Sequence, residues 1–414
     1  MPKLRWSFFL PARDHSFIKI FTLLSYSWLT PYGMILTTTL FISIGIASPG
    51  LHISAYLFTS ILLAFMLSAI LFSVFFIPEV TVSRKLLSIP HTGDYLIYEA
   101  IIKNISGKPL KGLSVTEGYL PYGLYYSFDH PKFNNYVSYL EPGKSATVTL
   151  VMYCAQRGIY TLPRLLIGSS YPSNIIRWPI KCGIKEPLVV FPFYISQTQF
   201  DIPLNSIYQP GGITITSTLG ESNEFLSTRE YRHGDRLKDI HWPSYARTGK
   251  LIVKEYINEY YTRTAIFIDT QFAPKDKPIN LEQRISYAAG IADALSNRGY
   301  LIDLLMAGEN LYEFKKGNPA TYLDQILNIL SSLEGLKTTD FKTVEAKLMN
   351  QASTLSSLVM ILRDWDEPRA RLCRTLKRIG LNLRIIIARD APLREIPDLD
   401  VTLVPTNDKK HLIP

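Results

Sequence analysis

Two long uncharged apolar runs near the N-terminus constrain the fold more than any other feature. No Asp, Glu, Lys or Arg occurs from Phe21 to Leu51, and a second such run extends from Ile53 to Pro78. About 20 helical residues cross the roughly 30 Å hydrocarbon core of a bilayer. We therefore expect two transmembrane helices, at about residues 28–47 and 55–76, joined by a tight turn at Pro49.

The basic residues around these runs predict an orientation. Residues 1–27 form a basic arm with four Lys or Arg and one Asp, and Arg84 and Lys85 follow the second run. Lys and Arg near the ends of a span are retained in the cytoplasm. We expect a protein of the inner (cytoplasmic) membrane with both termini cytoplasmic. A cleaved signal peptide is the alternative, but it needs one short apolar core and a cleavage site of small residues.

Cysteine usage and charge exclude several classes of protein. Cys154, Cys182 and Cys373 form no C-x-x-C pair, which argues against a disulfide framework or a zinc ribbon and favours a reduced compartment. The net charge of +9 is explained in part by the membrane-flanking arm. Residues 367–379 predict a basic helix, but neighbouring acidic residues favour a solvated helix face, so we expect no nucleic-acid partner.

Residues 79–205 change to short β-rich stretches. Alternation at period two appears at residues 95–105, 146–154 and 188–194, and turn residues separate these stretches. Half-buried antiparallel strands of this kind predict a β-sandwich of immunoglobulin-like type.

Residues 263–414 alternate between strand and helix patterns, which predicts a doubly wound α/β domain. The expected strands are 264–268, 300–306, 355–362 and 383–388, and the expected helices are 281–297, 321–333 and 367–379. Ligands of such sheets bind beyond the carboxyl ends of the strands. Asp269 follows the first strand at that edge.

The connecting segment, residues 206–262, contains an unusually dense mixture of charged and apolar residues. Such a mixture favours paired, partly buried charges, for which the forked guanidinium of Arg is suited. Its candidate residues are Arg229, Glu230, Tyr231, Gly234, Asp235, His241, Trp242, Ala246, Arg247, Gly249 and Glu255. They form either a structural ion-pair network at the junction of the two domains, a docking surface or a catalytic cluster.

Four short motifs in this segment resemble the signature of a bacterial and archaeal family known as Domain of Unknown Function 58. They are Arg229-Glu230-Tyr231, Gly234-Asp235, Ile240-His241-Trp242 and Ala246-Arg247-Thr248-Gly249, and the resemblance extends back to Arg157-Gly158-Ile159-Tyr160. Residues 171–176 depart from the family, which often has aspartate-proline-phenylalanine-glycine-leucine there.

The resemblance implies a membrane-anchored protein with a von Willebrand factor A-like C-terminal domain. Such proteins are associated with a MoxR-type AAA+ ATPase and a transglutaminase-like membrane protein. In von Willebrand A domains, an aspartate at the position of Asp269 begins an aspartate-x-serine-x-serine site, whose oxygens suit Mg²⁺.

This chain keeps the aspartate and replaces both serines, by Gln271 and Ala273. Either Asp269 binds Mg²⁺ in a degenerate site completed by Asp364 or Asp366, with Thr338 or Thr339, or it caps a loop or helix.

We expect a multi-domain chain with a two-span transmembrane α-hairpin, an immunoglobulin-like β-sandwich and a doubly wound von Willebrand A-like domain. Nucleotide-binding, metalloprotease and nucleophile-elbow motifs do not occur, and no nucleophile accompanies His241. The sequence therefore predicts a non-enzymatic interaction or scaffold protein without a cofactor. The family resemblance implies that it works with a MoxR-type ATPase in assembling a membrane or envelope complex. The alternative is a divalent-metal-dependent enzyme using Asp269, Asp364 and His241, or a metal-dependent ligand-binding protein.

Overall fold

The computed structural model describes most of the chain. The described residues are 28–48, 53–196, 225–256, 263–271, 278–298, 301–306, 311–312, 319–336, 341–352, 355, 357–388 and 401–404. The basic arm, residues 1–27, and Thr338 and Thr339 lie outside them. The chain divides into two compact units, with the main boundary between Tyr194 and Ile195.

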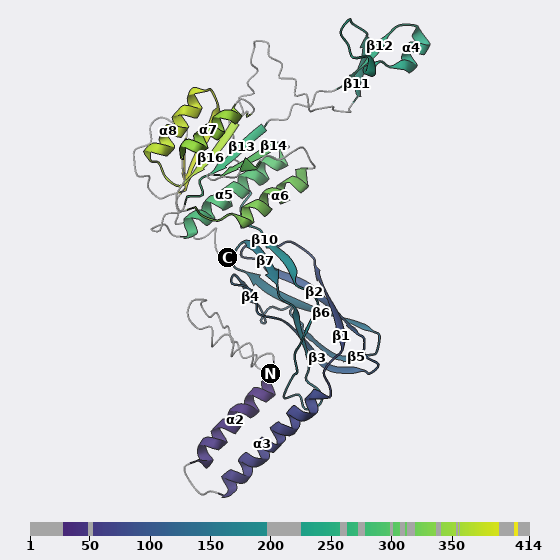
Figure 1. The fold of residues 1–414 in the computed structure, drawn as a ribbon, viewed down its shortest axis with the longest axis vertical. Helices are drawn as coiled ribbons and strands as arrows, with labels where there is room; N and C mark the ends of the chain where they lie inside the picture. Colours follow the sequence, from purple (N-terminus) through teal and green to yellow (C-terminus); the bar gives the residue numbers. More distant parts are fainter. Residues whose placement is uncertain are drawn as a thin grey trace. The chain divides into compact units, whose positions relative to one another are not determined.

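Two apolar helices lie at the N-terminal side, α2 (Pro31–Ala47) and α3 (Ile53–Val74) (Figure 1). Thr30 caps α2 by accepting a hydrogen bond from the Gly33 amide, and Pro31 occupies the first helical position, where its missing N–H has no cost. With 22 residues, α3 is long and apolar enough to cross a membrane, whereas α2 is apolar but has 17 residues. One membrane-crossing helix is thus supported by length and composition; a second span and the orientation stay predictions.

Two antiparallel four-stranded sheets form the strand-rich domain, residues 80–191. Their strand orders are β1-β2-β6-β4 and β5-β3-β8-β9, and β10 pairs with β7. The bounds are β1 Val80–Leu86, β2 Tyr95–Asn104, β3 Leu110–Glu117, β4 Leu124–Tyr126, β5 Tyr136–Leu140, β6 Ser145–Cys154, β7 Gly158–Leu162, β8 Leu165–Ser169, β9 Ile180–Cys182 and β10 Glu186–Val190. The strands expected at 95–105 and 146–154 are confirmed as β2 and β6. The strand expected at 188–194 corresponds to β10, which begins two residues earlier and ends at Val190.

Period-two alternation buries one face of each sheet in a shared core. Leu96, Tyr98, Ala100 and Ile102 of β2 are all buried there.

An ion pair lies within this core: Arg84 donates to Glu117 Oε1 at 2.9 Å and to Oε2 at 2.5 Å, and both side chains are buried. The Tyr98 hydroxyl donates to Glu117 Oε1 at 2.6 Å. Burial raises the pKa of Tyr98 and of Glu117, because it disfavours their charged forms.

A six-stranded sheet forms the α/β domain, in the order β15-β14-β13-β16-β17-β18. The strands are β13 Arg263–Ile268, β14 Leu301–Met306, β15 Leu311–Tyr312, β16 Ser357–Leu362, β17 Asn382–Ala388 and β18 Val401–Val404. All neighbours are parallel except β15, which is antiparallel to β14. The strand order reverses between β13 and β16, which makes their carboxyl ends the topological switch point.

Three helices pack on this sheet, α5 Pro278–Asn297, α7 Phe341–Ala352 and α8 Glu367–Arg378. Helix α6 spans Pro319–Ser332. Figure 1 shows α7 beside α8. Val344 and Leu348 of α7 and Leu372 and Leu376 of α8 share one core with the β13 and β16 side chains. The expected strands and helices of this domain are confirmed, and α7, β15 and β18 are additional.

Residues 225–256 form a small unit that we call the signature module, labelled β11, α4 and β12 in Figure 1. Strand β11 (Phe225–Glu230) pairs antiparallel with β12 (Ile252–Tyr256), so that Arg229 faces Val253. A short 3-10 turn (Leu237–Asp239) and α4 (Trp242–Thr248) connect the two strands.

Candidate functional site

An Arg–Asp pair closes the first turn of the signature module. Arg229 donates from Nη1 to Asp235 Oδ2 at 2.7 Å and from Nη2 to Asp235 Oδ1 at 2.8 Å. The Arg232 amide donates to Asp235 Oδ2 at 2.8 Å. These hydrogen bonds from Arg229 lower the pKa of Asp235 to about 2, since they stabilise its charged form. Gly234 lies in this turn with φ of 108°, a conformation that favours glycine.

His241 and Gly249 delimit the helix of the module. The His241 Nδ1 atom lies 2.6 Å from Ser244 Oγ, and the His241 amide donates to Ile252 O at 2.8 Å. Gly249 ends α4 in the left-handed region with φ of 66°, and its amide donates to Tyr245 O. These contacts give His241 and Gly249 a role in shaping the module.

Most side chains of the module are exposed. Among its described side chains only Ile240 and Val253 are buried. Trp242 is 58% exposed and Tyr245 is 42% exposed, and their rings meet edge to face at 6.1 Å.

The remaining signature residues lie on the same small unit. Ala246 and Arg247 are exposed on α4, and Tyr231 is half-buried at the end of β11. Glu230 accepts from Lys250 Nζ at 3.1 Å in an exposed pair. Glu255 lies on β12 opposite Ser227. The module thus brings the predicted signature residues together and presents an aromatic pair beside cationic side chains.

A second candidate site lies at the switch point of the α/β sheet. Asp269 directly follows β13 and is fully buried. Its Oδ1 accepts from the Gln271 amide at 3.1 Å, and its Oδ2 accepts from the Arg363 amide at 3.1 Å. Arg369 Nε donates to the same Oδ2 at 2.7 Å. Asp269 therefore caps its own loop and also forms a buried ion pair.

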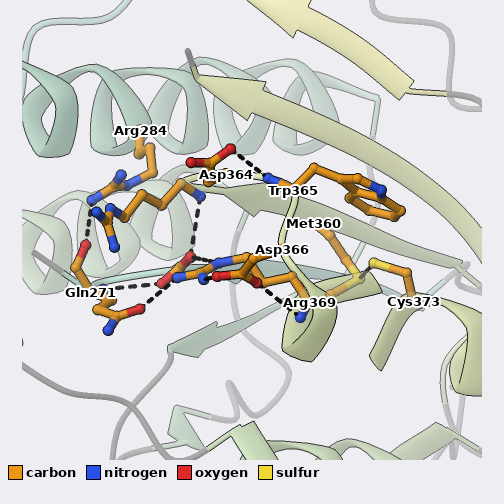
Figure 2. Close-up of polar contacts among 10 residues, drawn as sticks. Gln271, Arg284, Met360, Asp364, Trp365, Asp366, Arg369 and Cys373 are labelled. Atoms are coloured by element: carbon orange, nitrogen blue, oxygen red, sulfur yellow. Dashed lines mark hydrogen bonds and ion pairs between the residues drawn. The ribbon is translucent and has the colours of Figure 1, made fainter. Parts of the chain in front are cut away.

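The guanidinium of Arg369 connects three segments at this edge (Figure 2). Besides Asp269 it binds Gln271 Oε1 through Nη2 at 2.6 Å, and it binds Asp366 Oδ2 through Nη1. Asp366 is the N-cap of α8 and also accepts from the Arg369 amide at 3.2 Å. Arg284 of α5, buried as well, donates to Gln271 O at 2.9 Å. The loop after β13, the end of β16 and the first turn of α8 are thus held by charge-assisted hydrogen bonds.

The solvated helix face expected for residues 367–379 is wrong at Arg369, which is 1% exposed. Arg369 lies on the buried side of α8 with Leu372, Cys373 and Leu376, at the i, i+3, i+4, i+7 spacing of one helix face. That spacing is visible in the sequence. It could have identified Arg369 as a buried charge in need of an acidic partner.

The residues at this edge do not fit Mg²⁺. Both oxygens of Asp269 already accept hydrogen bonds, and the Arg369 guanidinium supplies positive charge at hydrogen-bonding distance. Asp364 is buried and its Oδ1 accepts from the Trp365 amide at 2.8 Å. In the described part of the chain, no group of three or more His, Cys, Asp or Glu side chains is arranged to hold a metal.

These observations define the class of protein. It has an apolar N-terminal helix, a strand-rich domain and an α/β domain, and an ion-pair network connects the loops at one edge of its sheet. Residues 227–407 match the family model described as Protein of unknown function DUF58. This match agrees with the family resemblance that the signature motifs predict for this part of the chain. No curated protein matches it.

Solved structures show only weak similarity. The CARDB domain of PF1109 from Pyrococcus furiosus is 17% identical, with a TM-score of 0.18, over 28% of this chain and 95% of that chain. E. coli alpha-2-macroglobulin is 19% identical, with a TM-score of 0.20, over 28% of this chain and 7% of that chain. The GH20 exo beta-N-acetylglucosaminidase of Vibrio harveyi is 9% identical, with a TM-score of 0.18, over 75% of this chain and 57% of that chain. None of these similarities bears on function.

Proposed function

We propose that this chain is a membrane-anchored, non-enzymatic interaction protein whose signature module docks a MoxR-type AAA+ ATPase during the assembly or maturation of a membrane or envelope complex. The observation that carries the proposal is the exposed Trp242–Tyr245 pair on a preformed, cationic module. A transglutaminase-like membrane protein is the second partner that we propose for the same assembly.

The composition of the exposed surface supports docking. Trp, Tyr and Arg are the residues that most often dominate binding energy at interfaces. Trp242, Tyr245 and Arg247 are all exposed on α4. Residues 225–256 hold seven Lys or Arg and four Asp or Glu, so an acidic partner surface is complementary.

The internal bonds of the module support the same role. The Arg229–Asp235 pair fixes the first turn, and Gly249 fixes the end of α4. A preformed surface loses less conformational freedom on binding, which favours affinity.

The domain identities in the proposal rest on architecture. The sheet order β15-β14-β13-β16-β17-β18, with the edge strand β15 antiparallel to β14, supports a von Willebrand A-like domain. Two facing antiparallel sheets support an immunoglobulin-like sandwich. The uncharged run that includes α2, together with the basic residues flanking both runs, supports two spans with cytoplasmic termini.

A divalent-metal-dependent enzyme or ligand-binding protein is the second candidate. It is favoured by the presence of Asp269, Asp364 and Asp366 at one edge of the sheet. It requires Arg369 to move away from Asp269, which would leave the buried guanidinium without its counter-charge. Docking needs no such rearrangement.

Affinity purification of the full-length chain from native membranes tests the docking proposal. We expect a MoxR-type ATPase to co-purify with the wild type and to be lost from a Trp242→Ala, Tyr245→Ala variant. A matched control is Tyr119→Ala, Tyr122→Ala, which removes two exposed aromatic rings from the strand-rich domain and should retain the ATPase. Equal recovery from all three proteins, or no ATPase with the wild type, contradicts the proposal.

A further inference from the structure

One end of the strand-rich domain lies directly beside the segment that leaves α3. The Ile105 amide donates to Glu79 O at 3.2 Å, five residues after the end of α3 at Val74. Two turns are tied together there by the buried Asn104. Its Nδ2 donates to Lys108 O at 2.9 Å and to Leu140 O at 3.1 Å, and its amide donates to Lys144 O at 3.0 Å.

The loop that departs from the family pattern holds this end against the helices. The Thr30 amide at the start of α2 donates to Ile175 O at 3.0 Å, and the Arg177 amide donates to Trp28 O at 2.7 Å. Ile175 and Ile176 pack in a small apolar cluster with Ala69 of α3. Residues 171–178 are thus seated on both helices, which gives the departing loop a structural role.

At the same end of the domain, exposed lysines outnumber the exposed carboxylates, Glu79 and Glu141. Four exposed lysines lie on the two turns and the adjoining strand ends: Lys103, Lys108, Lys111 and Lys144. None of them forms an ion pair with any residue that the structure describes. Ile105, 58% exposed, lies between the lysine-bearing positions 103 and 108.

Aromatic residues surround the junction with the helices. Trp28 and Trp178 meet at 5.0 Å, Phe76 and Tyr171 meet at 4.8 Å, and Lys111 Nζ lies 5.2 Å from the centre of the Tyr171 ring. Trp and Tyr concentrate at the level of lipid headgroups, where one part of the ring is apolar and the other is hydrated. Long lysine side chains at this level extend their ammonium groups toward phosphates.

We propose that this end of the domain, defined by Lys103, Ile105, Lys108, Lys111, Lys144 and Tyr171, rests on the bilayer and binds the headgroups of anionic phospholipids. The inference rests on the proposed membrane anchor. It follows from charge complementarity with the anionic leaflet and from continuity with the apolar helices. This contact would hold the strand-rich domain against the membrane surface.

Hydrogen exchange of the full-length chain in nanodiscs tests this contact. The probes are discs of phosphatidylcholine alone and discs with added phosphatidylglycerol. In the anionic discs we expect amides of residues 103–111 and 141–145 to exchange roughly tenfold more slowly or more, because each lysine near an anionic surface adds a factor of about five in binding. Residues 118–126, on a different loop and strand of the domain, should exchange equally in both discs.

Matched lysine variants separate this contact from general charge effects. Lys108→Gln, Lys144→Gln should lose most of the lipid dependence. Lys181→Gln, Lys185→Gln removes two exposed lysines away from this end, since Lys181 faces Leu166 at the far end of β8 from Ser169, and should keep it.

Equal exchange in both discs, or equal lipid dependence in the two variants, overturns the headgroup contact and leaves the anchor and the docking proposal intact. A chain that does not enter the discs overturns the anchor and this inference together, whereas loss of the ATPase partner affects only the docking proposal.

Discussion

The signature module and the switch point of the α/β sheet each contain an Arg–Asp pair, but the two pairs have opposite settings. Arg229 and Asp235 are six residues apart, and their side chains remain 33% and 18% exposed. Arg369 and Asp269 are 100 residues apart, and their side chains are 2% and 0% exposed. The dense motif in the sequence therefore forms the accessible pair, while the buried pair joins two residues that no local motif connects.

This difference separates two kinds of contribution. An exposed pair contributes little to stability because water screens it, so its value lies in shaping a surface. A buried pair is often no more stabilising than apolar packing, yet removing one partner leaves an uncompensated charge inside the protein. We therefore expect substitutions at the switch point to change folding and substitutions in the module to change binding.

The largest expected effect follows from Arg369→Met. This substitution leaves Asp269 buried without its counter-charge, which should lower the free energy of unfolding of the α/β domain by about 3–5 kcal/mol. Pulsed alkylation of Cys373 during a urea titration reports this domain, because burial raises the pKa of Cys373 to about 12. Cys154, whose pKa burial also raises to about 12, reports the strand-rich domain and should be unaffected.

A double variant checks the cause of that loss. Asp269→Asn, Arg369→Met removes both charges, so we expect it to be more stable than Arg369→Met alone. Additive destabilisation by the two substitutions would show that the ion pair is not what connects these residues.

The next effect is on binding. Trp242→Ala should weaken the affinity of the full-length chain for the proposed ATPase partner, in purified form, by about 30-fold, which corresponds to the roughly 2 kcal/mol of a central interface residue. Unfolding monitored at Cys373 should stay unchanged. If Trp242→Ala binds as tightly as the Tyr122→Ala control, the proposed docking role of the module is contradicted.

The smallest effect is the titration of the exposed pair. Asp235 has a pKa of about 2 in the folded protein, below the value of about 3.9 for an unperturbed Asp. A lowered folded-state pKa means that the pair stabilises the module fully above pH 3.9 and loses this effect as the pH falls through 2. Carboxylate NMR of the chain labelled at Asp should give a midpoint near 2, and Arg229→Gln should raise it. A wild-type midpoint near 3.9 contradicts the pairing.

Local patterns predicted most of the α/β domain and the family. Period-two and helical spacings located β13, β16, α5 and α8 to within a few residues, since these elements are defined by apolar residues close in sequence. Helix α7 was missed although Val344 and Leu348 follow helical spacing, because charged and polar residues dominate the rest of Phe341–Ala352.

Long-range pairing could not be predicted in the same way. Arg84 and Glu117 lie on different sheets, and Asp269 and Arg369 meet only because β13 and β16 are neighbours. Sequence patterns gave the position of Asp269 at the sheet edge but left open whether a metal or a side chain opposes it. The role of residues 171–176 was equally inaccessible, since it depends on their contact with α2 and α3.

The most direct test of this account is a calorimetric titration of Mn²⁺ and Mg²⁺ into the detergent-solubilised full-length chain, alongside Asp269→Asn. We expect no saturable heat that depends on Asp269, because the Arg369 guanidinium already opposes its carboxylate. Saturable binding by the wild type that is lost in Asp269→Asn would contradict it and would favour the metal-dependent alternative.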